Sequence, residues 1–118
     1  MKLIPEWHDH ERCLIAWPCN LELYRSQIHS ARKEISNLAN QLAEEEPVFI
    51  YCNSQDVKDC RFTVSNKKIT IIEADLDDSW MRDIAPIFYK EEQELRSINF
   101  NFNGYGKYPN FKNDNLVS

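Results

Sequence analysis

Val48 to Cys52 reads V-F-I-Y-C, an unbroken apolar run that decides the fold. Pro47 stands directly before it, and proline ends a preceding helix because it lacks a backbone donor. A short run rich in β-branched and aromatic side chains predicts a buried strand. Together with the strands and helices predicted on either side of it, this strand predicts an α/β fold.

The segments on either side of this strand fit the same architecture. Residues 13–17 read C-L-I-A-W and predict another buried strand. Between 23 and 45, apolar residues recur at spacings of three and four, which predicts an amphipathic helix. Beyond the first strand, residues 53–61 predict a short helix and residues 68–76 a third strand. The apolar stripe expected on the long helix consists of Ile28, Ala31, Ile35, Leu38 and Leu42.

Local signals complete this outline. Asn53 and Ser54 are predicted to cap the short helix, because their side chains accept hydrogen bonds from free helix amides. Residues 85–89 and 95–102 predict the two strands of a hairpin, with Glu91-Glu92-Gln93-Glu94 as its turn. The order of strands and helices is that of an α/β domain.

Composition excludes several function classes. Of the 118 residues, 42% are hydrophobic and 28% charged, as in ordinary globular chains. The net charge is −5. The sequence lacks the basic cluster with interleaved aromatic residues that would predict a nucleic-acid partner. No apolar run approaches the roughly 20 residues of a membrane span, and the N-terminus lacks a signal-peptide pattern. We therefore expect a cytoplasmic protein without membrane or nucleic-acid contacts.

The metal-binding residue types are sparse. A zinc site needs three or four ligands, and His8, His10 and Cys13 remain one such alternative to plain polar surface. No C-x-x-C pair occurs, so a zinc ribbon or a thioredoxin-type site is not predicted. Without a secretion signal the thiols are expected to be reduced. The four cysteines are Cys13, Cys19, Cys52 and Cys60.

The segment D-L-D-D-S-W-M-R-D, residues 75–83, holds most of the candidate chemistry. It follows the third predicted strand, and functional sites often lie on loops at strand ends. One interpretation is a Mg²⁺ site, since Asp75, Asp77 and Asp78 supply hard oxygen ligands; no phosphate-binding glycine loop accompanies them. Another is a solvated acidic loop with a partly buried tryptophan.

A third interpretation of this segment is a guanidinium site. The carboxylate of Asp83 can accept two parallel N–H bonds from a planar cation. The ring of Trp80, three residues earlier, can stack on the same cation. A carboxylate in this position can also localise the charge of the guanidinium and handle protons.

Residues 77–86, D-D-S-W-M-R-D-I-A-P, resemble the W-x-R-D signature of agmatine deiminases, in the bacterial (Porphyromonas-type) peptidylarginine deiminase family. Four further blocks resemble family segments, in the same order along the chain. They are Pro5-Glu6-Trp7, His10-Glu11-Arg12, Ala16-Trp17-Pro18 and Phe102-Asn103-Gly104-Tyr105-Gly106-Lys107. In the last block, Tyr105 stands where the family often has tryptophan.

The resemblance implies a fold and a reaction. The fold would be a partial pentein-type α/β propeller of the guanidino-modifying superfamily, covering roughly the first two blades. The reaction would be hydrolysis of a guanidino group, from agmatine to N-carbamoylputrescine and ammonia in putrescine biosynthesis. A cysteine thiolate attacks the guanidinium carbon in such enzymes. The partner would be a small guanidino substrate, and no metal or other cofactor is implied.

The resemblance also assigns roles to individual residues. Asp83 matches the catalytic carboxylate that binds the guanidinium group. Trp80 matches the aromatic residue beside the substrate, and Asp78 is a further substrate-binding candidate. Arg82 matches a signature position and is expected to brace the loop.

The family's catalytic histidine and nucleophilic cysteine have no match in this chain. We therefore expect residues 1–118 to be a single N-terminal portion of an agmatine-deiminase-like domain that is inactive alone. Because its sheet edges would be open, we expect either marginal stability or homo-oligomers. The alternatives are a non-catalytic remnant or interaction module, a deiminase of peptidyl-arginine, and an unrelated small α/β binding domain.

Overall fold

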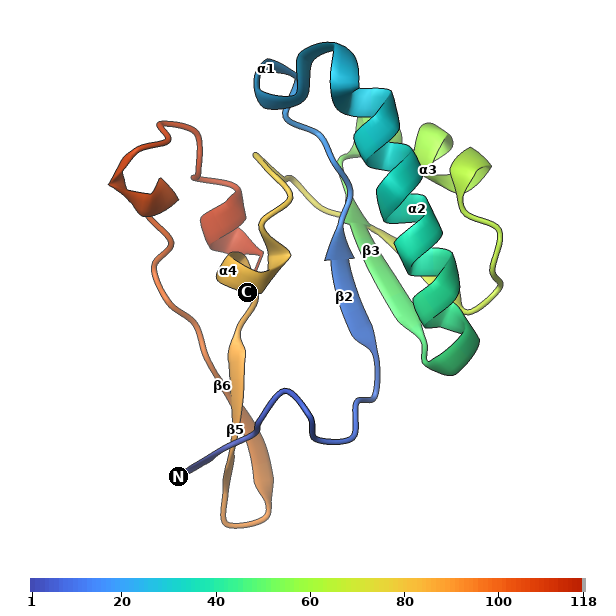
Figure 1. The fold of residues 1–118 in the computed structure, drawn as a ribbon. Coiled ribbons are helices and arrows are strands. Elements are labelled where there is room, and N and C mark those ends of the chain that lie inside the picture. Colours follow the sequence, from blue (N-terminus) through green and yellow to red (C-terminus); the bar gives the residue numbers. More distant parts are fainter. Residues whose placement is uncertain (118) are drawn as a thin grey trace.

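The computed structural model describes residues 1–117 and contains two three-stranded sheets (Figure 1). The first sheet is parallel, has the order β2-β3-β4, and consists of β2 (Cys13–Ala16), β3 (Val48–Cys52) and β4 (Ile69–Glu73). The second is antiparallel, has the order β1-β5-β6, and consists of β1 (Lys2–Leu3), β5 (Ile87–Glu91) and β6 (Glu94–Ile98). The predicted mixed α/β class is confirmed.

The long helix predicted over 23–45 is interrupted. Arg25 has a φ of 49°, which a continuous right-handed helix does not allow, and a 3-10 turn follows at Arg25–Gln27. The side chain of Asn20 caps the first helical piece by accepting a hydrogen bond from the Leu23 amide at 3.1 Å. The helices are α1 (Leu21–Tyr24), α2 (Ile28–Glu45), α3 (Val57–Thr63) and α4 (Met81–Ile84).

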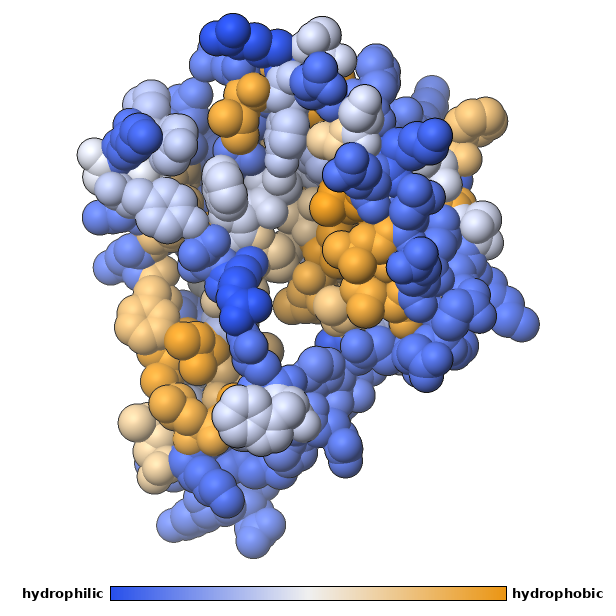
Figure 2. Space-filling model, viewed as in Figure 1, coloured by the Kyte–Doolittle hydropathy of each residue, from blue (hydrophilic) through white to orange (hydrophobic). Residues whose placement is uncertain are grey.

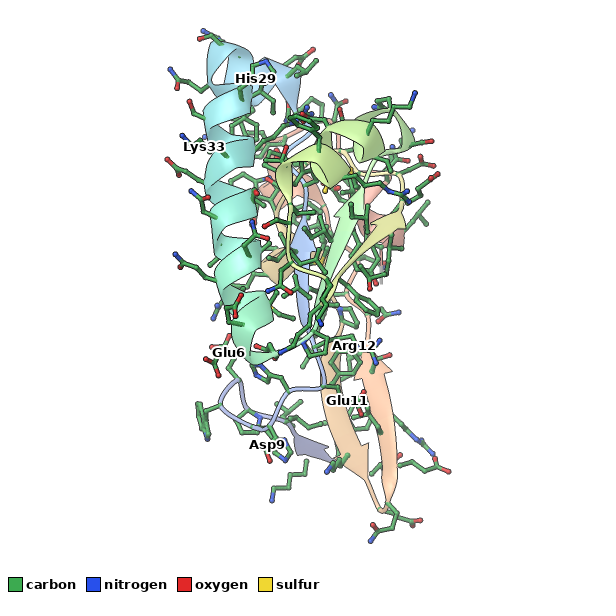
Figure 3. All side chains as sticks on the ribbon, turned by 90° about the vertical axis from the view of Figure 1, so that its right-hand side faces the viewer. Glu6, Asp9, Glu11, Arg12, His29 and Lys33 are labelled. Atoms are coloured by element: carbon green, nitrogen blue, oxygen red, sulfur yellow. The ribbon has the colours of Figure 1, made fainter. Side chains whose placement is uncertain are left out.

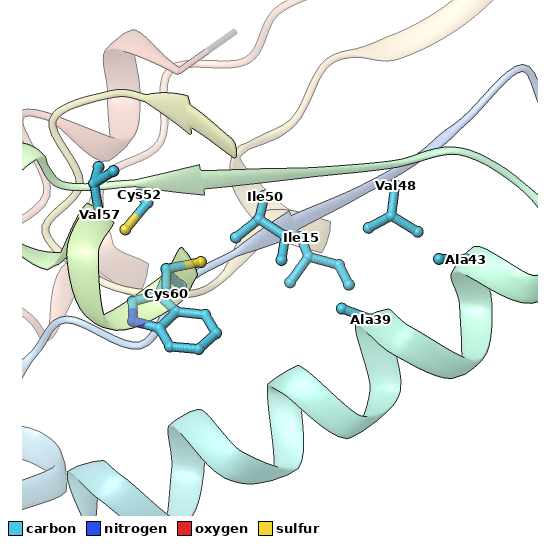
Figure 4. Close-up of a cluster of buried hydrophobic side chains, with 9 residues drawn as sticks. Ile15, Ala39, Ala43, Val48, Ile50, Cys52, Val57 and Cys60 are labelled. Atoms are coloured by element: carbon cyan, nitrogen blue, oxygen red, sulfur yellow. The ribbon is translucent and has the colours of Figure 1, made fainter. Parts of the chain in front are cut away.

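The main core lies between α2 and the parallel sheet. Ala39 and Ala43 of α2 face Val48 and Ile50 of β3 (Figure 4), and all four are fully buried. Leu38, predicted to lie in the buried stripe, is instead 47% exposed. The small alanine side chains let the helix approach the sheet closely, so the buried face is rotated away from the larger leucine. Ile28, Ile35 and Leu42 contribute to the core or its margin, as the spacing predicts.

Asn53 does not cap the short helix as predicted. Its side chain accepts from the Leu76 amide at 2.8 Å and donates to the Leu76 carbonyl at 3.1 Å. A 3-10 turn at Ser54–Asp56 leads into α3 instead. Because Asn53 follows β3 directly, these two bonds fasten the loop after β4 to the end of the central strand.

The hairpin turn is tighter than predicted. Glu91 and Glu94 are opposite each other in the last rung of the ladder, so only Glu92 and Gln93 form the turn. Glu92 has a φ of 55°, and positive φ is what two-residue hairpin turns require. Figure 2 shows apolar side chains gathered over this hairpin sheet. Exposed members of the sheet are Leu3, Ile87, Phe88 and Leu95.

Within residues 1–117, no helix has the length and apolar character that crossing a membrane would require.

Candidate functional site

The loop after β4 borders a cleft of about 230 Å³. The start of α1 forms one further part of the wall, and the segment that follows the hairpin returns to the loop and forms another. This segment contains the 3-10 turns Gly104–Gly106 and Asp114–Leu116. The cleft is lined by, among others, Asn20, Asp78, Trp80, Gly104, Tyr108 and Asp114.

Asp114 is the site residue that the sequence did not predict. It is buried, and its Oδ1 accepts hydrogen bonds from the Asp77 amide at 2.8 Å and the Asp78 amide at 3.2 Å. In the opposite direction, Asn113 donates from its backbone amide and its side-chain amide to the Asp77 carboxylate, at 2.8 and 3.0 Å. The run Asn113-Asp114-Asn115 is a turn-forming signal from which this turn could have been predicted.

The charge of Asp114 is poorly compensated. Burial raises its pKa, while the bonds from the two backbone amides lower it and the neighbouring Asp77 and Asp78 raise it further. Its Oδ2 is buried without a hydrogen-bond partner. The geometry of Asp114 therefore favours a loop-bracing role that depends on the Oδ1 acceptor rather than on full ionisation.

Replacing Asp114 separates these contributions. Asp114→Ala removes the acceptor of two buried amides, so we expect a loss of about 1–3 kcal/mol in the free energy of unfolding. Asp114→Asn keeps an oxygen acceptor and should stay within about 1 kcal/mol of the wild type. Because the pKa of Asp114 is higher in the folded than in the unfolded chain, its contribution to the free energy of unfolding is full below the unfolded pKa. That contribution is lost as the pH rises through the folded pKa. Urea unfolding at several pH values checks this, and equal losses for both variants would contradict it.

Asp78 forms the wall of the cleft and is already engaged. Its Oδ2 accepts from the Asn20 side chain at 3.0 Å, and its Oδ1 accepts from the Ser79 amide at 2.8 Å. The Ser79 hydroxyl in turn is 2.9 Å from the Tyr24 hydroxyl. Asp78 is buried, so it joins the loop to α1 while it faces the cleft.

Trp80 borders the cleft at the edge of an aromatic cluster. Its ring meets Tyr105 edge to face, with centroids 6.2 Å apart and planes at 89°. Tyr105 meets Phe102 in the same way at 5.2 Å and Tyr108 at 6.4 Å. Such perpendicular pairs stabilise the positions of the rings beyond their burial. Tyr105 is therefore the centre of the cluster, although the sequence singled it out only as a departure from the family pattern.

The backbone of this turn is left-handed at three successive residues. Gly104, Tyr105 and Gly106 have φ values of 62°, 58° and 66°. A Cβ on Gly104 would lie 3.0 Å from the Phe111 ring, so glycine is required there both for its φ and for space. The two glycines of the chain thus serve to place Tyr105 in the cluster.

Asp83 lies on α4 and is exposed, next to this cluster. Asp78 and Trp80 line the cleft, whereas Asp83 and Tyr105 lie outside its lining. Partial desolvation, followed by the hydrogen bond and the charge of Asp83, raises the pKa of Tyr105 to about 12. Arg82 pairs with Glu6 instead of with Asp83, and both partners of that pair are exposed. Among residues 1–117, no basic side chain forms an ion pair with Asp83. The carboxylate is therefore available to a cationic ligand.

The cysteines are not activated as nucleophiles. Burial, together with the charge of Asp78, raises the pKa of Cys19 to about 12. The hydrogen bond with Cys60 and then burial raise the pKa of Cys52, and burial raises that of Cys13. All four are free thiols. Raised pKa values leave little thiolate at neutral pH, and the thiolate is the reactive form.

The acidic and histidine residues do not converge on a metal position. Within residues 1–117, no three His, Cys, Asp or Glu side chains are arranged so that they could hold an ion. His10 contacts Glu46 and the Glu6 carbonyl, and Asp77 is engaged by Asn113.

The features above define a class: an α/β chain with an aromatic and acidic cleft at the end of a parallel sheet. The model of the Porphyromonas-type peptidyl-arginine deiminase family matches residues 2–118, and the chain belongs to this family. A curated relative from Legionella pneumophila is 31% identical over 116 residues, 96% of this chain and 33% of its own length. The agmatine deiminase of Pseudomonas aeruginosa is 26% identical over 104 residues, 87% of this chain and 28% of its own.

Solved structures agree on the fold. The agmatine deiminase of Enterococcus faecalis superposes with a TM-score of 0.91 at 24% identity, over 99% of this chain and 33% of that one. A substrate-bound agmatine deiminase variant of C. jejuni superposes with a TM-score of 0.79 at 25% identity, over 98% of this chain and 34% of that one. The chain thus spans about a third of the length of the relatives it matches.

Proposed function

We propose that this chain provides the guanidinium-binding part of an agmatine-deiminase-like hydrolase. The observation that carries the proposal is the exposed Asp83 carboxylate, which has no ion-pair partner among residues 1–117 and lies beside the aromatic cluster of Trp80 and Tyr105. A carboxylate next to aromatic rings is suited to a flat, delocalised cation. Membership of the deiminase family supports the same ligand class.

Each residue would have a separate task. Asp83 would accept the guanidinium N–H groups and hold the charge in place during attack on the central carbon. Trp80 would stack on the planar cation, with Tyr105 supporting its ring from the side. Asp78 would contribute negative charge from the cleft wall, while its own hydrogen bonds keep the loop in shape.

Agmatine suits the acidic cleft beside Asp83 better than arginine does. Glu22 and Asp78 line this cleft, and the net charge of the chain is −5. A second cation, such as the ammonium group of agmatine, is favoured in such a field, whereas a free carboxylate is repelled. Competition between agmatine, arginine and an arginine amide for binding to the chain would rank these substrates.

We also propose that residues 1–118 correspond to roughly the first two blades of a pentein-type propeller. The superpositions over about a third of each deiminase support this placement. The nucleophilic cysteine and the catalytic histidine would then come from polypeptide outside the aligned third.

Incubation of the purified chain with agmatine is expected to release no ammonia above the blank. The pKa values of Cys13, Cys19 and Cys52 are raised, and Cys60 is buried, so the chain has no activated thiolate. A coupled ammonia assay measures this, with the Pseudomonas aeruginosa enzyme as the positive control. Ammonia release that disappears in the Asp83→Ala variant would show that one of these cysteines is the nucleophile after all.

A further inference from the structure

The outer edge of β4 has no partner strand within residues 1–117. Figure 3 shows this pale yellow strand at the margin of the molecule. On the other side of β4, the Lys68 carbonyl accepts a hydrogen bond from the Val48 amide at 3.1 Å. The Ala74 amide donates to the Cys52 carbonyl at 3.0 Å. The N–H and C=O of one strand residue point to the same side, and the sides alternate along the strand. Ile69, Ile71 and Glu73 therefore present their backbone groups to the free edge.

Only some of the backbone groups on this edge are free to bond a further strand. The Ile69 amide already donates to the Asn66 carbonyl at 3.1 Å. What remains is the carbonyl of Ile69 and both backbone groups of Ile71 and of Glu73. An antiparallel strand of the same sequence, centred on Ile71, would use all of these except the Glu73 carbonyl: Ile71 would exchange two hydrogen bonds with the partner's Ile71, and the Ile69 carbonyl would accept from the partner's Glu73 amide.

The charges that flank β4 fit the same register. Lys67 precedes the strand and Asp75 follows it, and both are exposed. Lys67 lies in the turn that leads into β4, which the bond from the Ile69 amide to the Asn66 carbonyl closes. Centring on Ile71 brings this turn to the end of the partner strand that leads to the partner's Asp75, so the two opposite charges lie near each other twice by symmetry. Their attraction favours this register over shifted ones.

The surface beside the edge is also open to a second copy. A groove of about 370 Å³ is lined by Val64, Ile69 and Ile71, with Arg61 among its walls. The partner's Glu73, opposite Ile69, would lie on the face that carries this groove and bring a carboxylate toward Arg61. Within residues 1–117, Arg61 forms no ion pair. The strand contains no proline and no bulge of the kind that protects edges.

From these observations we propose that β4 is a self-association edge, through which two copies of the chain form a continuous six-stranded sheet about a two-fold axis at Ile71. Pairing through a single strand buries less surface than the roughly 1,200–2,000 Å² of a stable interface. The dimer is therefore weak and concentration-dependent. The proposal does not rest on the guanidino chemistry of the cleft.

Sedimentation equilibrium over a wide concentration range tests the backbone pairing. Glu73→Pro removes an amide that faces the free edge, where proline is tolerated, and should leave the chain monomeric at all concentrations. The matched control, Glu73→Ala, keeps the amide and should still dimerise. A wild-type chain that is monomeric throughout, or a dimer that Glu73→Pro leaves unchanged, would overturn the proposal. Circular dichroism at low concentration confirms that both variants fold.

A charge swap tests the register. Lys67→Asp and Asp75→Lys each turn two attractive pairs into repulsive ones and should each weaken the dimer by about tenfold. The double variant reverses both charges and should restore wild-type association. If the double variant is as weak as the single ones, Lys67 does not face the partner's Asp75 and the proposed register is wrong.

Discussion

Agmatine is expected to bind Asp83→Asn at least about tenfold more weakly than the wild-type chain, because hydrogen bonds to a charged group contribute about 1.5–3 kcal/mol. The substitution keeps the shape of the side chain and removes only its charge. Asp83 is exposed on α4 and pairs with no cation within residues 1–117, so the fold should not change.

The measurement is a titration of the chain with agmatine, followed by tryptophan fluorescence and by calorimetry. Asp75→Asn is the matched control, since it removes the same charge from an exposed position in the loop that leads from β4 to α4. Butylamine, which has an ammonium group but no guanidinium, serves as the control ligand and should bind both chains equally weakly.

Each outcome of this titration has a distinct meaning. A loss of binding confined to Asp83→Asn supports the proposed guanidinium site. Equal binding by both variants would place the agmatine elsewhere. If the wild-type chain binds no agmatine at all, the alternative of a non-catalytic remnant or interaction module is favoured for this chain by itself.

Arg32→Ala should lower the free energy of unfolding by about 2–4 kcal/mol, because it leaves a partly buried carboxylate unpaired. The Arg32 guanidinium, 11% exposed, donates to Asp59 at 2.7 Å and to Asp56 at 2.9 Å. Its Nε also donates to the Pro18 carbonyl at 3.0 Å. One side chain of α2 thus joins α3 to the end of β2.

Two further variants isolate the cause. Arg32→Lys keeps the positive charge but cannot reach three acceptors with one ammonium group, so an intermediate loss is expected. Lys33→Ala changes the next residue, which projects from the outer face of α2 (Figure 3), and should stay within about 0.5 kcal/mol of the wild type. Urea unfolding followed by circular dichroism provides the values. If Arg32→Ala were as mild as Lys33→Ala, the network would contribute nothing to stability.

Several elements could be predicted from the sequence because their signals are local. The bounds of β3 are those of the apolar run V-F-I-Y-C, and the predicted strands and helices occur in the predicted order, to which the structure adds β1 and α4. The motif around Trp80 and Asp83 indicated the deiminase family, which the family model confirms. The roles of the two residues remain predictions that the binding experiments address.

Other features depend on contacts between residues far apart in the chain. The spacing in α2 predicted a buried Leu38, yet Ala39 and Ala43 face the sheet because small side chains permit closer packing. Asn53 satisfies the capping pattern for a helix, but the Leu76 backbone, 23 residues away, competes successfully for its side chain. A local pattern cannot rank such competing partners.

The sequence by itself determined the α/β class, the strand-helix-strand order and the residues that carry the deiminase signature, because hydrophobic periodicity and short motifs act over a few neighbouring positions. Only the tertiary structure decided that Asp114 braces the loop at Asp77 and Asp78, and that Tyr105 forms the centre of the aromatic cluster beside Asp83. These arrangements exist because the chain returns to the end of the sheet after the hairpin, and the partners of a buried carboxylate or ring are known only when that return path is known.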